Sequence, residues 1–113
     1  MLKLEDITWD NFGAVISLKL ESLQERFTKP NSIFIAQGYV NVSMNYLNTL
    51  KAVTIDNTVI GFAKWVDLPK HTAPYHLTED ATLIDALMID KAYQGKGLGK
   101  QALDLIIESI KED

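Results

Sequence analysis

The sequence contains no cysteine, only three prolines, and no apolar run long enough to cross a membrane. Without cysteine the chain cannot form disulfides, a thiolate zinc site or a cysteine nucleophile, which fits a reducing cytoplasm. A membrane-spanning helix needs roughly 18 consecutive apolar residues, and the opening "MLKLEDITWD" is too acidic for a signal peptide. We therefore expect a cytoplasmic protein that does not act in a membrane.

Positive charge is scarce as well, since 11 Lys and Arg residues stand against 15 Asp and Glu, a formal net charge of −4 at pH 7. Nucleic-acid-binding proteins contact phosphates through basic patches, so nucleic acid is not an expected partner, whereas a cationic small molecule is compatible. The length of 113 residues and the hydrophobic share of 47% predict a single domain, residues 1–113, large enough to bury a core.

Hydrophobic periodicity predicts the elements of the first half of the chain. Residues 2–7 predict a short strand, and residues 8–27 predict one amphipathic helix because their apolar positions repeat at helical spacing. Ser32 caps a second predicted helix that reaches about Asn41. Residues 42–50 either extend this helix or connect it to the next strand.

A hairpin, a buried strand and a final helix follow. Residues 50–55 and 58–66 are rich in β-formers and flank Asp56-Asn57, a pair that tolerates the positive φ of a tight hairpin turn. Residues 81–89 predict a buried strand, and a last amphipathic helix begins at residue 97 or 98. The order β–α–α–β–β–β–α predicts an α/β or α+β domain with a mixed sheet.

The stretch "YQGKGLGKQAL", residues 93–103, places three glycines at alternate positions between that strand and that helix. The N–H groups of a first helical turn lack intrahelical partners and lie at the positive end of the helix dipole, so such a turn is typical of a phosphate site. A Walker A loop is excluded because Gln101 stands where Ser or Thr is needed, and a dinucleotide-binding G-x-G-x-x-G motif is poor because position 100 is Lys. The alternative is a tight strand-to-helix turn, for which one glycine usually suffices.

The segment "QGKGLG", residues 94–99, matches Q/R-x-x-G-x-G/A, the signature of the GNAT N-acetyltransferases. "MIDKAYQGKGLGKQAL" most resembles the bacterial spermidine/spermine-type members, and "ITWDNFGAVISLKL" and "TVIGFAKW" are similar to the same proteins in the corresponding places. The resemblance implies a GNAT-like fold, acetyl-CoA as the cosubstrate, and acetyl transfer to an amine, with a polyamine as one candidate acceptor.

The resemblance also implies which residues bind acetyl-CoA. Main-chain N–H groups of residues 94–99 would bind the pyrophosphate, residues 87–89 would pair with the pantetheine arm like an added strand, and the Ile89 N–H would polarise the thioester carbonyl. Lys96 and Lys100 would add positive charge to the phosphate site. The expected set is Leu87, Met88, Ile89, Gln94, Gly95, Lys96, Gly97, Leu98, Gly99 and Lys100.

Few residues are candidates for the chemistry. Asp85, the one charge in its predicted strand, is the candidate catalytic base or cation-binding carboxylate, and the alternative is a strand-edge residue that faces solvent. Glu79 and Asp80 either attract a polyamine or are solvated loop charges. No metal is expected, because His71 and His76 have no third ligand in register.

The aromatic residues are expected to serve packing first. Trp9 and Trp65 are predicted in the core or at its edge, and Tyr39 and Tyr46 either pack or line an acceptor pocket. Members of the family typically continue past the cofactor-binding helix with a strand, a helix carrying the tyrosine that protonates CoA, and a hairpin. This chain ends at "IIESIKED", so we expect a domain truncated after that helix, without the usual acid, for which Tyr93 is no substitute.

Two functional interpretations follow, with a third in reserve. The first is an acetyl-CoA-dependent N-acetyltransferase. The second is a catalytically inactive, truncated or engineered GNAT-like domain that acts as a CoA-binding, dimerising or scaffold module. The third, a generic nucleotide-phosphate binder, requires that CoA fail and another diphosphate bind the loop. A truncated sheet would leave residues 81–89 with an open edge, which predicts a homodimer through that edge or by chain swapping.

Overall fold

A computed structural model describes residues 1–21, 29–72 and 75–112. None of the described helices is both long and apolar enough to cross a membrane. The elements, in chain order, are β1 (Leu2–Asp6), α1 (Phe12–Ile16), α3 (Asn31–Ser43), β2 (Asn48–Ile55), β3 (Thr58–Leu68), β4 (Ala81–Ile89), the short 3₁₀ turn η1 (Lys91–Tyr93) and α4 (Leu98–Glu112).

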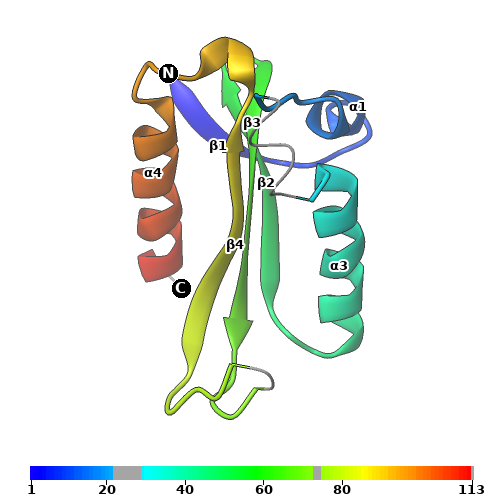
Figure 1. Cartoon of the computed structure of the whole chain (residues 1–113), viewed down its shortest axis with the longest axis vertical. Helices are drawn as coiled ribbons and strands as arrows, with labels where there is room; N and C mark the ends of the chain where they lie inside the picture. The colour runs from blue at the N-terminus through cyan, green and yellow to red at the C-terminus, as the bar shows by residue number, and fades with distance from the viewer. Residues whose placement is uncertain (22–28, 73–74, 113) are drawn as a thin grey trace.

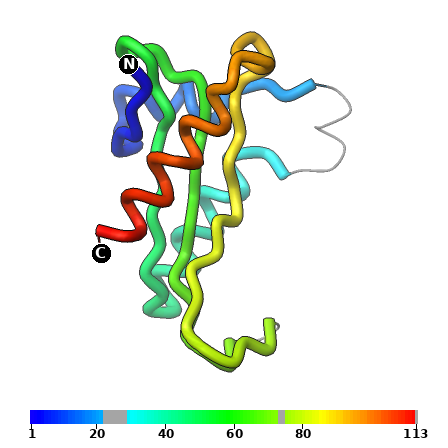
Figure 2. The backbone as a smooth tube through the Cα atoms, turned by 90° about the vertical axis from the view of Figure 1, so that its left-hand side faces the viewer, coloured from blue at the N-terminus to red at the C-terminus, as the bar shows by residue number. Residues whose placement is uncertain are grey.

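The four strands form one sheet in the order β1-β2-β3-β4, and each neighbouring pair is antiparallel. Helix α4 covers one face, whereas α1 and α3 cover the other (Figure 1), and Figure 2 shows α4 lying across its face of the sheet. The predicted mixture of helices and strands is confirmed. The sheet built by the described residues is antiparallel rather than mixed, and β4 lies at one edge of it.

The predicted hairpin and last strand are confirmed. Asp56 and Asn57 join β2 to β3 with φ values of +48° and +68°, as a two-residue turn with both φ positive requires. The strand predicted at residues 81–89 is β4, but its predicted burial is wrong, because β4 lies at the sheet edge and only Ile89 among its residues is buried. The open question after the second helix is also settled, because α3 ends at Ser43 and β2 begins at Asn48.

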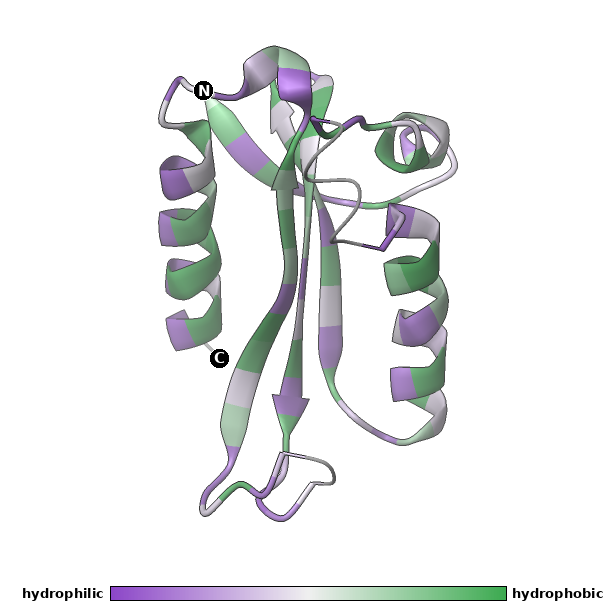
Figure 3. Ribbon diagram, viewed as in Figure 1, coloured by the Kyte–Doolittle hydropathy of each residue, from purple (hydrophilic) through white to green (hydrophobic). Residues whose placement is uncertain are grey.

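The main core lies between α4 and the sheet. Ala102 and Ile106 of α4 are fully buried in one cluster with Val53, Ile60 and Trp65 of the strands. Figure 3 shows that α4 turns its hydrophobic side toward the sheet and its hydrophilic side away, as its periodicity predicts. The opposite face carries a smaller buried cluster of Val15, Ala52 and Phe62.

The prediction of one continuous helix over residues 8–27 is wrong. Helix α1 ends at Ile16, and the chain then crosses to the end of β4. The Lys19 N–H donates to Asp90 Oδ1 at 2.7 Å, and the Lys19 carbonyl accepts from the Lys91 N–H at 2.7 Å. These bonds use the main-chain groups that a longer helix would need, so tertiary contacts override the local periodicity. The last part of the predicted helix lies outside the described residues.

The two tryptophans differ in burial. Trp65 is 3% exposed and belongs to the core, as predicted. The prediction for Trp9 is wrong, since its side chain is 90% exposed. Trp9 lies in the turn before α1, and its ring meets the edge of Phe12 at a centroid distance of 5.7 Å. A position ahead of the helix, rather than on its buried side, explains the exposure.

Candidate functional site

The glycine-rich loop connects the end of β4 to the start of α4. Gly95 and Gly97 adopt φ values of +81° and +75°, the left-handed region in which a Cβ is disfavoured, and a Cβ at either position would meet no heavy atom within 4 Å. Gly99 already lies in α4 with no positive φ, and its Cβ would meet only Ile89 Cγ1, at 3.9 Å. The loop therefore turns sharply while leaving open space beside its backbone.

That space belongs to a cavity of about 400 Å³, here called the loop cavity. Its volume lies within the roughly 300–1,000 Å³ that is usual for small-molecule sites. The cavity opens where the edge of the sheet, the loop and the positive end of α4 meet. Its lining consists of Leu20, Leu87, Met88, Ile89, Tyr93, Gln94, Gly95, Gly97, Leu98 and Gly99.

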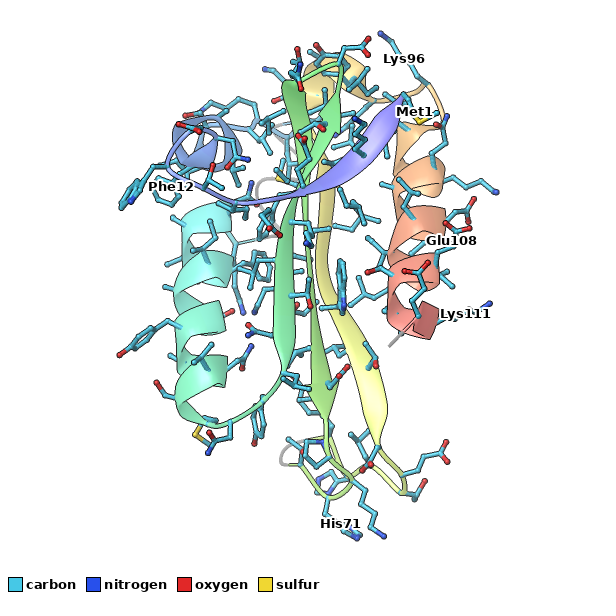
Figure 4. The ribbon with its side chains drawn as sticks, turned by 180° about the vertical axis from the view of Figure 1, so that it is seen from behind. Met1, Phe12, His71, Lys96, Glu108 and Lys111 are labelled. Carbon is cyan, nitrogen blue, oxygen red and sulfur yellow. The ribbon has the colours of Figure 1, made fainter. Side chains whose placement is uncertain are left out.

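The structure thus brings all of the expected cofactor-binding residues except two to one cavity. The exceptions are the lysines, which lie on the exposed rim of this end of the molecule, where Figure 4 labels Lys96. Lys100 Nζ lies 3.4 Å from Asp104 Oδ2, one helical turn further along α4, and Lys96 Nζ lies 5.6 Å from the centre of the Tyr93 ring. Both ammonium groups can contribute charge from the rim.

The edge of β4 presents main-chain groups to the loop cavity. The Asp90 N–H donates to the Ile60 carbonyl of β3 at 2.7 Å, and Ile89 pairs with Gly61. Because bonding directions alternate along an antiparallel strand, the N–H and C=O of Ile89 and Leu87 point away from β3, whereas those of Met88 point toward it. The Gln94 side chain confirms this direction, since its Nε2 donates to the Ile89 carbonyl at 2.8 Å.

Asp85 is the extra residue of a β-bulge. Lys64 pairs with Ala86, but Trp65 pairs with Ile84, so Asp85 has no direct partner in β3. Its Oδ2 accepts from Lys64 Nζ at 2.8 Å, and the two side chains are 22% and 1% exposed. Asp85 therefore points into the protein on the α3 side of the sheet rather than out to solvent.

The ion pair is incompletely satisfied. Asp85 Oδ1 is buried and accepts no hydrogen bond from the described residues. Lys64 Nζ lies 5.8 Å from the centre of the Phe34 ring, a cation–π contact in addition to its hydrogen bond with Asp85. A buried acceptor without a donor costs about 1–3 kcal/mol, so stability alone does not account for this arrangement.

The pair borders a second cavity of about 670 Å³, here called the α3 cavity, between α3 and the strands β3 and β4. Its lining includes Lys29, Phe34, Tyr46, Lys64, Tyr75 and Asp85. An intermediate hollow of about 310 Å³ shares Leu20 and Met88 with the loop cavity and Lys29 with the α3 cavity. The three spaces therefore adjoin along the face of β4.

Other candidates from the sequence lie elsewhere. Tyr39 is 74% exposed on the outside of α3 and lines neither cavity, whereas Tyr46 lines the α3 cavity. Glu79 and Asp80 lie exposed in the β3–β4 connection. His71 lies in the same connection, at the opposite end of the molecule from Lys96 (Figure 4). Among the described residues, no group of three His, Cys, Asp or Glu side chains could hold a metal ion.

Three residues of this region were not anticipated from the sequence. Lys64 could have been found from the sequence, because it is a single charge within the apolar stretch 61–66 of β3. In the structure it pairs with Asp85. Leu20 could not have been found in this way, since it was expected on a helix and instead lines the loop cavity. Asp90 was not singled out in the sequence, and its contact with Lys19, 71 positions away in the chain, is visible only in the fold.

Comparisons with known proteins identify the family of this chain. A search of the solved structures gave no significant match. Among curated proteins, the "Probable spermine N(1)-acetyltransferase" of Bacillus subtilis subsp. natto (strain BEST195) is 24% identical over 116 aligned positions, which cover 98% of this chain and 69% of that protein. The model of the "Acetyltransferase (GNAT) family" matches residues 3–113, and the chain therefore belongs to the GNAT acetyltransferases.

Proposed function

We propose that this chain binds acetyl-CoA in the loop cavity and transfers the acetyl group to an amine that enters from the α3 cavity. Acetyl-CoA is the cosubstrate of this family, and the residues present fit it. The observation that carries the proposal is one cavity in which the strand edge, the two positive-φ glycines and the start of α4 converge.

The loop would hold the pyrophosphate. N–H groups of residues 95–99 lie at the positive end of α4, whereas the Gln94 N–H donates to the Lys91 carbonyl at 3.4 Å. The open space beside Gly95 and Gly97 lets phosphate oxygens approach the backbone. Lys96 and Lys100 would add long-range attraction from the rim, modest because both side chains are exposed.

The edge of β4 would hold the pantetheine arm and the thioester. Leu87 and Ile89 direct their N–H and C=O groups away from β3, so an extended amide chain can pair with them as an added strand. The Ile89 N–H would polarise the thioester carbonyl and stabilise the oxyanion that forms during attack. Gln94 would help to orient Ile89 by its bond to the Ile89 carbonyl, which belongs to the next peptide group along the chain.

Asp85 would act on the acceptor. A protonated amine in the α3 cavity would donate to Asp85 Oδ1, which accepts no hydrogen bond from the described residues, while Lys64 holds Oδ2. The amine must lose a proton to become a nucleophile; its nitrogen then bonds to the acetyl carbon and the carbon–sulfur bond breaks. CoA leaves as a thiolate and takes up the second proton, which the nitrogen releases as the amide forms. Asp85 is the proposed acceptor of the first proton.

The finer acceptor class we propose is a polyamine. The support is the name of the Bacillus relative, a probable spermine N(1)-acetyltransferase, and the resemblance of residues 88–103 to polyamine-type members. The competing possibility is a domain that binds CoA, or only keeps the fold, without turnover. These differ in whether free CoA appears when acetyl-CoA and an amine are supplied together.

A calorimetric titration with acetyl-CoA tests the cofactor site. We expect saturable binding by the wild type and none by Gly97→Trp, whose indole would fill the loop cavity. The matched control is Gly13→Trp in α1, because Gly13 also has open space around it and lines no cavity described above. A folded wild type that does not bind acetyl-CoA would contradict the proposal.

An acceptor screen tests the chemistry. Release of CoA thiol is followed with spermine, spermidine, a monoamine and no amine, using wild type and Asp85→Asn. We expect turnover with polyamines and at least a 100-fold lower kcat for Asp85→Asn, the usual scale of a lost general base. Acetyl-CoA binding without turnover on any amine would support the inactive module instead.

A further inference from the structure

We infer that Asp90 is a positioning residue: it holds the segment after α1 against the end of β4 and thereby sets the affinity for acetyl-CoA. This inference rests on the proposed function of the loop cavity. It concerns a residue outside the glycine motif that makes no contact with the proposed chemistry.

Asp90 bonds to its surroundings through all of its polar groups. Oδ1 accepts the Lys19 N–H at 2.7 Å, and Oδ2 accepts the Ala92 N–H at 3.1 Å. Its own N–H donates to the Ile60 carbonyl at 2.7 Å, and its carbonyl accepts the Tyr93 N–H at 2.8 Å. Hydrogen bonds to an ionised carboxylate are shorter and stronger than neutral ones, so the two side-chain bonds are well suited to fix a connection.

The contact with Lys19 is reciprocal. The Lys91 N–H donates to the Lys19 carbonyl at 2.7 Å while the Lys19 N–H donates to Asp90. Both main-chain groups of Lys19 are therefore bonded to the end of β4. Figures 1 and 2 show this meeting, with the segment that follows α1 running past the upper end of β4. We call this two-bond contact the Lys19 clamp.

The clamp determines where Leu20 lies. Leu20 follows Lys19 directly and lines both the loop cavity and the intermediate hollow, together with Met88. Without the clamp, this wall would have to be ordered when acetyl-CoA binds, and that ordering reduces affinity. Asp90 would also hold η1 through Ala92, so one side chain connects the wall of the cavity to the turn that begins the glycine loop.

Asp90→Asn is the first test. The amide keeps the size of the side chain but replaces one acceptor oxygen by a donor, so it cannot accept from both Lys19 and Ala92. We expect the calorimetric Kd for acetyl-CoA to rise roughly tenfold, the scale of one lost hydrogen bond to a charged group. The matched control is Asp67→Asn, whose carboxylate accepts from the Thr82 hydroxyl at 2.9 Å and lines neither of the two cavities. Its Kd should equal that of the wild type.

Lys91→Pro is the second test and opens the other half of the clamp. Asp90 has φ −54° and ψ 141°, the extended conformation that favours a following proline, and proline is well tolerated at the first position of a helical turn. The substitution removes the N–H that donates to the Lys19 carbonyl and also the Lys91 side chain, for which Lys91→Ala is the control. We expect weaker acetyl-CoA binding by Lys91→Pro than by Lys91→Ala, with an unchanged circular dichroism spectrum. Amide hydrogen exchange at Lys19, measured without ligand, should be slow in the wild type and much faster in Asp90→Asn.

The outcomes separate this inference from the proposed function. A wild type that binds acetyl-CoA, together with Asp90→Asn and Lys91→Pro variants that bind equally well, would overturn the role of Asp90 and leave the proposed function intact. A folded wild type that does not bind would overturn both. Equal loss of affinity in Asp67→Asn would also overturn the inference, because the effect would then not be specific to the clamp.

Discussion

Gly95, Gly97 and Gly99 stand two residues apart in the sequence, and the structure separates their roles. The first two occupy the left-handed region of φ, where glycine is favoured because it has no Cβ. Gly99 has helical backbone, and a Cβ added at this position would have no close neighbour. The glycine spacing in the sequence therefore predicts where the loop lies, but it does not predict which glycine needs a positive φ.

Substitution by alanine should distinguish these glycines. Gly97→Ala should lower the free energy of unfolding by about 1 kcal/mol, because a Cβ at φ +75° is strained. Gly99→Ala should be neutral or stabilising by up to about 1 kcal/mol, since alanine favours the helix and its Cβ fits. Urea unfolding of the two variants measures both effects. Equal losses would mean that Gly99 is also constrained by the fold.

The Lys64–Asp85 pair makes a second prediction at this scale. Lys64→Met should destabilise by about 3 kcal/mol, because it leaves a largely buried carboxylate without its partner. Changing both residues, Lys64→Met with Asp85→Leu, should recover most of that loss, since an apolar pair has no desolvation cost. Chemical unfolding of the single and double variants measures the interaction free energy between Lys64 and Asp85.

Activity provides the control for that series. The double variant should be stable and inactive if Asp85 is the proton acceptor. A stable double variant that still acetylates amines would contradict the role of Asp85, and a double variant as unstable as the single one would show that the pair contributes stability on balance.

At the scale of elements, the sequence predicts the bounds of β4 well and those of α1 poorly, for different physical reasons. The bounds of β4 follow from a mostly apolar run that follows a polar loop, although as an edge strand it is largely half-buried rather than buried. The apolar repeat that suggested one helix continues past Ile16, yet the chain leaves the helix because Lys19 is bonded to Asp90 and Lys91. Local patterns contain no information about such a partner. The bulge at Asp85 is hidden for the same reason, since register is a property of two strands.

The pairing of β1 with β2 should depend on pH through one cross-strand contact. Asp6 lies directly opposite Lys51, with Oδ1 2.6 Å from Nζ, and this ammonium holds the pKa of the Asp6 carboxyl below its ordinary value. A lowered pKa in the folded state stabilises the protein above the unfolded-state pKa. This stabilisation is lost as the pH falls through the folded-state pKa.

The matching measurement is thermal unfolding of wild type and Asp6→Asn between neutral pH and strong acid. The wild type should have the higher Tm at neutral pH, by a small margin because the pair is exposed. The two curves should converge in acid and separate less in high salt. A difference that persists in acid would assign the effect of the substitution to something other than this charge.

For the whole molecule, the proposed site depends on the sheet having different neighbours on its two faces and an edge at β4. Helix α4 directs its start to the loop cavity from one face, while the segment after α1 reaches it from the other. The glycine motif predicted the first of these from the sequence. The second could not be predicted, because it depends on residues 71 positions apart coming together. The edge of β4 is therefore the one surface that the proposed cofactor and a second chain would both use.

That competition gives the last prediction. If the edge of β4 pairs two chains, as expected for an unpaired strand, acetyl-CoA should dissociate the dimer, because the same main-chain groups of Leu87 and Ile89 cannot serve both. At a ligand concentration 100 times its Kd, mass action weakens the dimer by about 100-fold for each site that must be vacant. Sedimentation equilibrium with and without acetyl-CoA measures this shift. The Gly97→Trp variant should dimerise to the same extent with and without acetyl-CoA. A dimer that acetyl-CoA leaves unchanged would place the interface elsewhere, for which the uncharged outer side of α3, with exposed Tyr39 and Val42, is the next surface to mutate.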